Sequence, residues 1–268
     1  MNDLSESVAR LSRDLRTAAV TLSEQEARFL VDSYYTIQEN RIRNQHQMTA
    51  MSKNREPHLL LGWLYDQNFI LENQIKSALD RYSMSTPVGE WLRGQFGIGP
   101  VIAAGLMAML DITKAPTVGH FWSHAGLIPG QKKEKGKKLQ WNMGLKSLCW
   151  KAGESFVKFS NNDECYYGKV YKERKELEMR RNEAGEFGEQ AARILTEKNF
   201  NKSTEAYKAY VEGKLPPAHV HARARRYAVK LFLSHLHDFM YRDFYKAEPP
   251  LPYPIAHLEH VHFIHRPN

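Results

Sequence analysis

Residues 96–110 read FGIGPVIAAGLMAML, and this stretch decides the fold. Two glycines flank Ile98, so a helix that precedes them must end here, and Pro100 suits the first turn of a new helix. Residues 101–110 are almost wholly apolar, which predicts a short buried helix. The sequence therefore predicts a sharp turn between two helices.

The segment before this turn predicts long amphipathic helices. Residues 23–52 contain no proline or glycine, Ser23 and Glu26 form a possible capping box, and apolar residues recur at helical spacing. A second helix is expected over residues 57–82, and it would pack against the first as an antiparallel hairpin. Because long helices of this kind often associate, residues 1–85 are predicted to form a hairpin that makes a homo-oligomer.

The segment after the turn also predicts only helices. Residues 86–160 are expected to form a compact helical domain around the turn, with Thr86 and Pro87 opening its first helix. Residues 161–268 are expected to pack on this domain as a helical region. Its last long helix starts at two prolines, ends near Tyr245 and leads into an extended tail rich in proline and histidine. The predicted fold class is all-α.

Composition and charge narrow the class of protein. The chain is 42% hydrophobic and 25% charged, as globular proteins are, and its net charge of +8 attracts polyanions such as nucleic acid. Cys149 and Cys165 lack the spacing of a zinc site, the N-terminus lacks the apolar core of a signal peptide, and no apolar run has membrane-spanning length. We expect a cytoplasmic protein that does not enter membranes.

The turn matches the helix-hairpin-helix pattern of a glycine, an aliphatic residue, a second glycine and a small residue inside the next helix. Glycines let the backbone approach a phosphate, and the unpaired amides at the start of the second helix would meet its charge. Such contacts position DNA without reading its bases. The alternative is a tight turn in a helical core. The predicted DNA contacts here are Gly97, Ile98, Gly99 and Val101.

A lysine-rich segment, GQKKEKGKKLQ at residues 130–140, predicts an exposed, flexible loop. Its lysines are interpreted as phosphate contacts, which would make binding depend strongly on salt; a solvated loop without a partner is the alternative. Trp141 could stack on an exposed base, although a core position is commoner for tryptophan, and Lys146 would add a further contact. The predicted loop contacts are Lys132, Lys133, Lys135, Lys137 and Lys138.

The last helix carries a second set of candidates. His219 and three cations recur on one face at helical spacing, and this basic stripe is either a second DNA-facing surface or a solvated face. The tail contains His260 and His262, which could chelate zinc or nickel, but no recognised ligand spacing is completed, so neither a metal nor a cofactor is predicted. The predicted DNA contacts of the stripe are Arg223, Arg226 and Lys230.

Residues 97–133, GIGPVIAAGLMAMLDITKAPTVGHFWSHAGLIPGQKK, resemble the C-terminal domain of insertion-sequence transposases that pair a RuvC-like domain with a catalytic serine. The resemblance covers about residues 91–158 and rests on the glycine hairpin, Asp111 after the apolar helix, the AGLIP turn and the basic loop. It implies DNA binding in transposition or recombination, with a guide RNA as a possible partner. Two features depart from the family: residues 1–90 predict helices in place of the RuvC-like domain, and QKKEKG at 131–136 lacks the loop serine.

Three functions remain open from the sequence. The first is a non-catalytic DNA-binding protein of transposase descent, preferred because an unassisted lysine cannot replace the missing hydroxyl nucleophile. The second is an active transposase that uses Ser123, Ser147 or Ser155 as a substitute nucleophile, or borrows a catalytic domain from a partner. The third is a helical interaction protein that oligomerises and ignores DNA.

Overall fold

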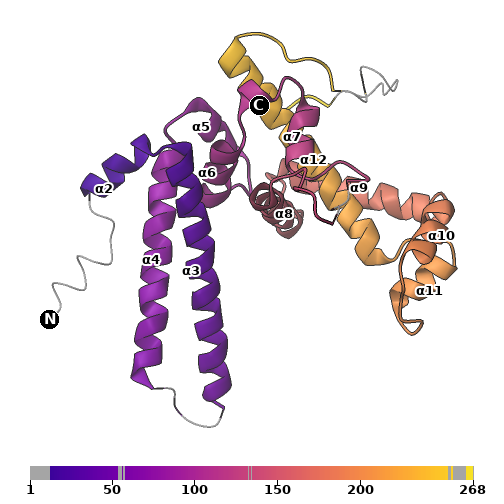
Figure 1. The fold of residues 1–268 in the computed structure, drawn as a ribbon, viewed down its shortest axis with the longest axis horizontal. Helices are drawn as coiled ribbons and strands as arrows, with labels where there is room; N and C mark the ends of the chain where they lie inside the picture. The colour runs from indigo at the N-terminus through magenta and orange to yellow at the C-terminus, as the bar shows by residue number, and fades with distance from the viewer. Residues whose placement is uncertain are drawn as a thin grey trace. The chain divides into compact units, whose positions relative to one another are not determined.

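The protein is described by a computed structural model over residues 13–53, 56, 58–131, 133, 135–252, 255 and 264–267. Every regular element in these residues is helical: eleven α-helices and two short 3-10 helices (Figure 1). The all-α prediction is confirmed. None of the described helices combines the length and apolar character needed to cross a membrane.

The chain divides into two compact units, and their boundaries differ from the division predicted at residues 85 and 160. Unit 1 consists of the described residues up to Gly94 together with Ile98–Lys114 and Asp243–Lys246. Unit 2 consists of Gln95–Gly97, Ala115–Arg242 and the described residues from Ala247 onward. The helices on both sides of the glycine turn thus belong with the N-terminal helices, and the helix after the turn shares a buried cluster with them.

Unit 1 is built around two long helices, α3 and α4, that lie side by side and run in opposite directions (Figure 1). The predicted capping box at the start of α3 is present: the backbone amide of Ser23 donates to the Glu26 carboxylate at 2.7 Å, and the Ser23 hydroxyl accepts from the Glu26 amide. The elements of unit 1 are α2 (Arg13–Ala18), η1 (Ala19–Thr21), α3 (Glu24–Met51), α4 (Leu59–Ser83), α5 (Pro87–Gly94), α6 (Pro100–Met109) and η2 (Ile112–Lys114).

The core of unit 1 forms where α6 packs against α3 and α4. Small side chains on α6 let it approach the two long helices closely, and Leu79 of α4 is fully buried against them. This confirms the predicted burial of residues 101–110, of which only Ile102 and Met107 are half-buried. The buried cluster is Ala27, Val31, Tyr34, Leu79, Tyr82, Val101, Ala104 and Ala108.

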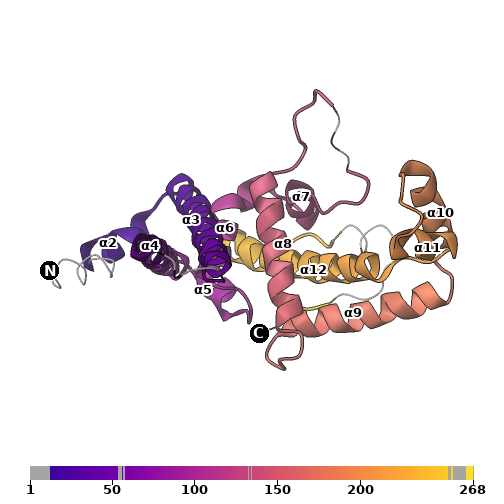
Figure 2. The ribbon, with the colours of Figure 1, turned by 90° about the horizontal axis from the view of Figure 1, so that it is seen from below.

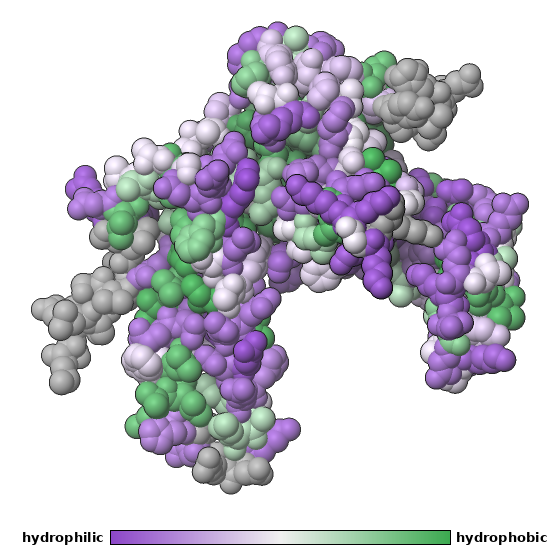
Figure 3. Space-filling view, viewed as in Figure 1, coloured by the Kyte–Doolittle hydropathy of each residue, from purple (hydrophilic) through white to green (hydrophobic). Residues whose placement is uncertain are grey.

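The part of α4 farthest from this core leaves apolar side chains uncovered. Leu60, Trp63 and Leu64 are exposed, and Figure 3 shows apolar side chains over the lower half of the α3–α4 pair. The buried Glu72 carboxylate of this unit accepts hydrogen bonds from Arg41 and Gln38. The predicted oligomer stays a prediction.

Unit 2 is organised around its last helix, α12, which buries side chains along most of its length. Phe156 of α8, Tyr167 of α9 and Phe232 of α12 form an aromatic core, with ring centroids 5.1 to 5.4 Å apart. The elements of unit 2 are α7 (Val118–His124), α8 (Met143–Lys158), α9 (Tyr166–Glu183), α10 (Gly188–Glu197), α11 (Glu205–Val211) and α12 (Pro217–Tyr245, the last three residues of which belong to unit 1).

Four histidines of α12 form hydrogen bonds with other parts of unit 2. His237 hydrogen-bonds the Ala115 carbonyl at 2.8 Å, and burial lowers the pKa of its imidazole. In the described residues there is no group of three or more histidines, cysteines or carboxylates that could hold a metal ion, and His260 and His262 lie outside those residues. Three further histidines pair with tyrosine hydroxyls: His219 with Tyr210, His221 with Tyr171, and His235 with Tyr167.

Candidate nucleic-acid interface

Gly97 is the residue of the turn whose conformation requires glycine. Its φ of 94° lies in the region that side-chain-bearing residues rarely adopt. Within unit 2, the Ser155 hydroxyl donates to the Gly97 carbonyl oxygen at 2.6 Å. A Cβ atom at Gly97 would lie 3.1 Å from that hydroxyl oxygen. The turn is therefore fixed both by its backbone and by a contact from α8.

The remaining turn residues present backbone rather than side chains. Ile98 and Val101 are buried, and Arg93, which also pairs with Asp80, donates to the Ile98 carbonyl at 2.9 Å. Gly99 has an ordinary extended backbone, and nothing lies within 4 Å of the position a Cβ would take. No side chain caps the start of α6, and Pro100 at its first position has no amide hydrogen, so the amides that follow lack a side-chain partner.

The two glycines should therefore respond differently to alanine. Gly97→Ala is expected to lower the free energy of unfolding by about 1–2 kcal/mol, because alanine is strained at this positive φ. Gly99→Ala should change it little, since its backbone is ordinary and the space is open. Urea denaturation followed by circular dichroism measures both, and equal losses would contradict the assignment of strain to Gly97.

The lysine-rich segment lies on a loop whose two ends are joined. The Asn142 amide donates to the His124 carbonyl at 2.8 Å, and the loop leaves α7 and returns to the start of α8 (Figure 2). Asn142 also caps α8, because its side chain accepts from the Leu145 amide. Lys132 lies outside the described residues. The four described lysines of the loop are all exposed: Lys133, Lys135, Lys137 and Lys138.

Trp141 packs at the base of this loop. A Cβ at Gly126, which has a φ of 64°, would lie 2.9 Å from the Trp141 ring. The Lys146 ammonium lies 4.6 Å from the ring centroid, and both side chains are half-buried. Trp141 thus has contacts typical of a packed residue, and stacking on a base stays a prediction for it.

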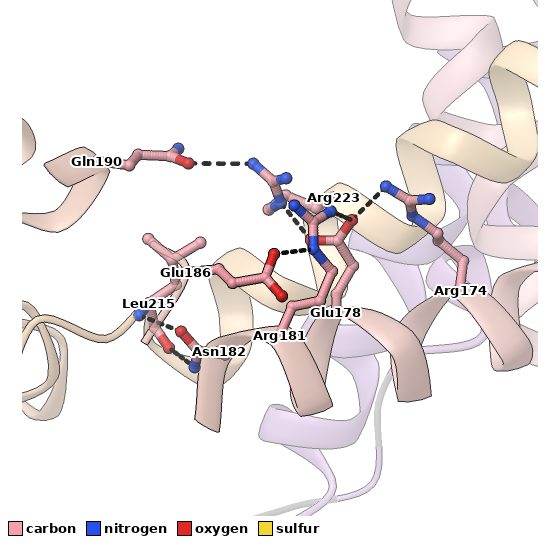
Figure 4. A network of polar contacts seen from close by, with 8 residues as sticks. All are labelled: Arg174, Glu178, Arg181, Asn182, Glu186, Gln190, Leu215 and Arg223. Carbon is pink, nitrogen blue, oxygen red and sulfur yellow. Dashed lines mark hydrogen bonds and ion pairs between the residues drawn. The ribbon is translucent and has the colours of Figure 1, made fainter. Parts of the chain in front are cut away.

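The predicted basic stripe of α12 is not a uniform solvent face. Arg223 donates to the carboxylate of Glu178 at 2.7 Å and to Gln190 at 3.1 Å (Figure 4). Lys230 is half-buried, with its ammonium 4.1 Å from the Trp122 ring centroid. Of the three predicted contacts, only Arg226 is exposed. The sequence could not distinguish them, because helical spacing does not show which cation has an internal partner.

Glu178 is the centre of this network. It is buried, and besides Arg223 it pairs with Arg174 at 2.6 Å and with Arg181 at 3.9 Å (Figure 4). Burial alone would raise the pKa of its carboxyl, but Arg223 and Arg174 hold that pKa below its ordinary value. Glu178 therefore stays charged and neutralises the arginines around it, among them Arg223, which the sequence predicted as a DNA contact.

The three serines proposed as substitute nucleophiles lie in different surroundings. The Ser155 hydroxyl donates to the Gly97 carbonyl, so its hydrogen bond supports the turn. The Ser123 hydroxyl accepts a hydrogen bond from the side-chain amide of Gln131 at 3.1 Å, and Ser147 is exposed on α8. Gln131 thus hydrogen-bonds a serine hydroxyl. Gln131 itself lies at the start of the segment in which the family resemblance would place the catalytic serine.

Sequence reasoning missed Trp150 and Met143 on α8. Each is 53% exposed, while Leu145, Leu148 and Phe156 of the same helix are buried. The signal was their helical phase, since neither lies in the apolar stripe that faces the core. Chemically, the loop and α8 of unit 2 offer exposed cations beside exposed apolar surface. No protein-family model matches this chain, and no curated protein or solved structure matches it either.

Proposed function

We propose that this protein binds DNA through its phosphate backbone, as a non-catalytic relative of the transposase domain that it resembles. The observation that carries the proposal is the loop between α7 and α8, which presents exposed lysines on a base closed by Asn142 and Trp141. Cations that neutralise phosphates release counterions, and this supplies sequence-independent affinity for DNA. A net charge of +8 favours the same class of partner.

The glycine turn supports the proposal independently. The start of α6 lacks a side-chain cap, and nothing lies within 4 Å of the position that a Cβ at Gly99 would take. Amides in this position attract anions, because they lack helical partners and lie at the positive end of the helix dipole. This contact would involve only the protein backbone and the DNA phosphates, so it would not depend on the DNA sequence. The same holds for the loop contacts.

The loop is tested by the salt dependence of duplex binding. For the wild type, affinity for a labelled duplex should fall steeply as salt rises. Replacing Lys133, Lys135, Lys137 and Lys138 together by glutamine is expected to reduce the slope of log affinity against log salt by about 0.9 for each phosphate that the loop no longer neutralises. The control replaces four exposed lysines elsewhere: Lys53, Lys76, Lys198 and Lys202. Equal effects in the two variants would refute a specific role for the loop.

The role of the glycine turn in DNA binding is tested by introducing a negative charge at Gly99. Gly99→Glu places a carboxylate where the backbone and the space allow it, and should weaken duplex binding by repulsion. Gly62→Glu makes the same change on α4, where a Cβ also meets nothing within 4 Å, and should not. Products are resolved on a denaturing gel with magnesium present. Intact strands are expected, whereas cleaved or rejoined strands would favour an active transposase.

A further inference from the structure

The solvent face of α8 carries two exposed apolar side chains, one of which, Met143, accepts a hydrogen bond at its sulfur from the Trp141 indole at 3.1 Å. Met143 and Trp150 are seven residues apart, which is two helical turns, so they lie on one side of the helix. The exposed Ser147 lies between them, and Lys146 is within about one turn of both. These four residues, Met143, Lys146, Ser147 and Trp150, form what we call the α8 face.

The indole of Trp150 is held in place by α12. The Arg225 guanidinium lies 5.4 Å from the ring centroid, and its direction is fixed by an ion pair with Glu154. Gly153 allows this close approach, since a Cβ there would lie 2.8 Å from Arg225. The ring is thus positioned by a cation on one side and remains 53% exposed. An aromatic plane ordered before binding loses little freedom when a ligand stacks on it.

The positive charge around the α8 face favours a nucleic acid as its ligand. The face follows directly after the loop that carries Lys133, Lys135 and Lys138, and Lys146 lies on the face itself. An aromatic plane beside cations is the combination that single-stranded nucleic acids require, because bases stack on the ring and phosphates meet the cations. In a duplex the faces of the bases are covered by neighbouring base pairs, so an indole cannot reach them without extruding a base.

A second copy of this chain fits the face poorly. A stable interface buries on the order of 800 Å² on each partner and has an apolar centre depleted in charge. Here two exposed apolar side chains are separated by Ser147 and accompanied by Lys146. Two such faces brought together would oppose like charges.

We propose that the α8 face binds single-stranded nucleic acid, with one unpaired base stacked on Trp150 and the adjoining phosphates on Lys146 and the loop lysines. The inference rests on the proposed DNA binding and deepens it, because it names the strand state that unit 2 recognises. Trp150 is the residue that distinguishes a single strand from a duplex, whereas the loop lysines bind either.

The test compares Trp150→Ala and Trp150→Phe with wild type for binding to labelled oligothymidylate, oligouridylate and a DNA duplex. Trp150→Ala should weaken single-strand binding about tenfold, because a stacked base loses its platform, and should leave duplex affinity within about twofold. Trp150→Phe should retain most of the affinity. Trp63→Ala is the matched control, since Trp63 is 56% exposed on α4, and should have no effect.

Each outcome decides the proposal. A wild type that binds the duplex but neither single strand overturns the α8 assignment and leaves DNA binding intact, whereas no binding to any probe refutes both. Unchanged single-strand affinity in Trp150→Ala, or equal affinity of the wild type for an abasic strand, also overturns it. A change of oligomeric state in Trp150→Ala, seen by size exclusion, would assign the face to a second copy. Comparison of the two oligonucleotides identifies DNA or RNA as the preferred strand.

Discussion

Glu178→Gln is expected to lower the free energy of unfolding by about 3 kcal/mol, at the lower end of the cost of breaking a buried ion pair. The amide keeps the size of the side chain but removes the charge that neutralises Arg174 and Arg223. Both arginine side chains are 25% exposed, so water relieves part of the cost. Urea denaturation followed by circular dichroism measures the loss.

The control for this variant lies on the same helix. Glu183 forms a 2.6 Å ion pair with Lys214, but its side chain is 72% exposed. Glu183→Gln should therefore cost less than about 1 kcal/mol. Similar losses in both variants would mean that Glu178 is no more important than a surface carboxylate.

The stability difference between wild type and Glu178→Gln should also depend on pH. Because the pKa of Glu178 is lowered in the folded protein, its contribution is present above the ordinary carboxyl pKa of about 4.3 and is lost as the pH falls through the lower folded value. The stability difference between wild type and Glu178→Gln should therefore shrink as the medium is acidified below about pH 4. A constant difference would indicate a packing effect instead of a charge effect.

Leu79→Ala is expected to lower the free energy of unfolding by about 2–5 kcal/mol, because it removes a fully buried side chain and leaves a cavity between α3, α4 and α6. Leu71→Ala removes the same atoms from the same helix at a position that is 44% exposed, and should cost less than half as much. Chemical denaturation of the two variants provides the measurement. Equal effects would show that the cluster around Leu79 does not limit the stability of unit 1.

Local sequence patterns predicted the individual helices well, but they did not predict which helices share a core. The capping box at Ser23 and the apolar run at residues 101–110 are signals within a few turns, so the sequence contains them completely. The grouping of α6 with α3 depends on Val101 and Val31 sharing one core although they lie far apart in the chain, which no local pattern reveals. The predicted boundary at residue 85 consequently separated helices that share a core.

The candidate site shows the same limit at the level of single side chains. Charge density predicted that the loop lysines would be exposed, and the described ones are. Arg223 looked equivalent to Arg226, because its partner Glu178 lies on another helix, 45 positions earlier. The sequence singled out Trp141 as a possible stacking residue and missed Trp150, because local sequence shows neither the packing of Trp141 against Gly126 nor the exposure of Trp150.

Because the two ends of the loop between α7 and α8 are held together, the length of its tip can change during evolution. The hydrogen bond between Asn142 and His124 and the contact of Trp141 with Gly126 already hold the two ends of the loop together. Lengthening the tip then adds only loop-closure entropy, roughly 0.6 kcal/mol for each doubling of length. Insertions and deletions between these anchors can therefore change the number and spacing of cations while α7 and α8 keep their packing, so the length and charge of the loop can diversify without a new fold.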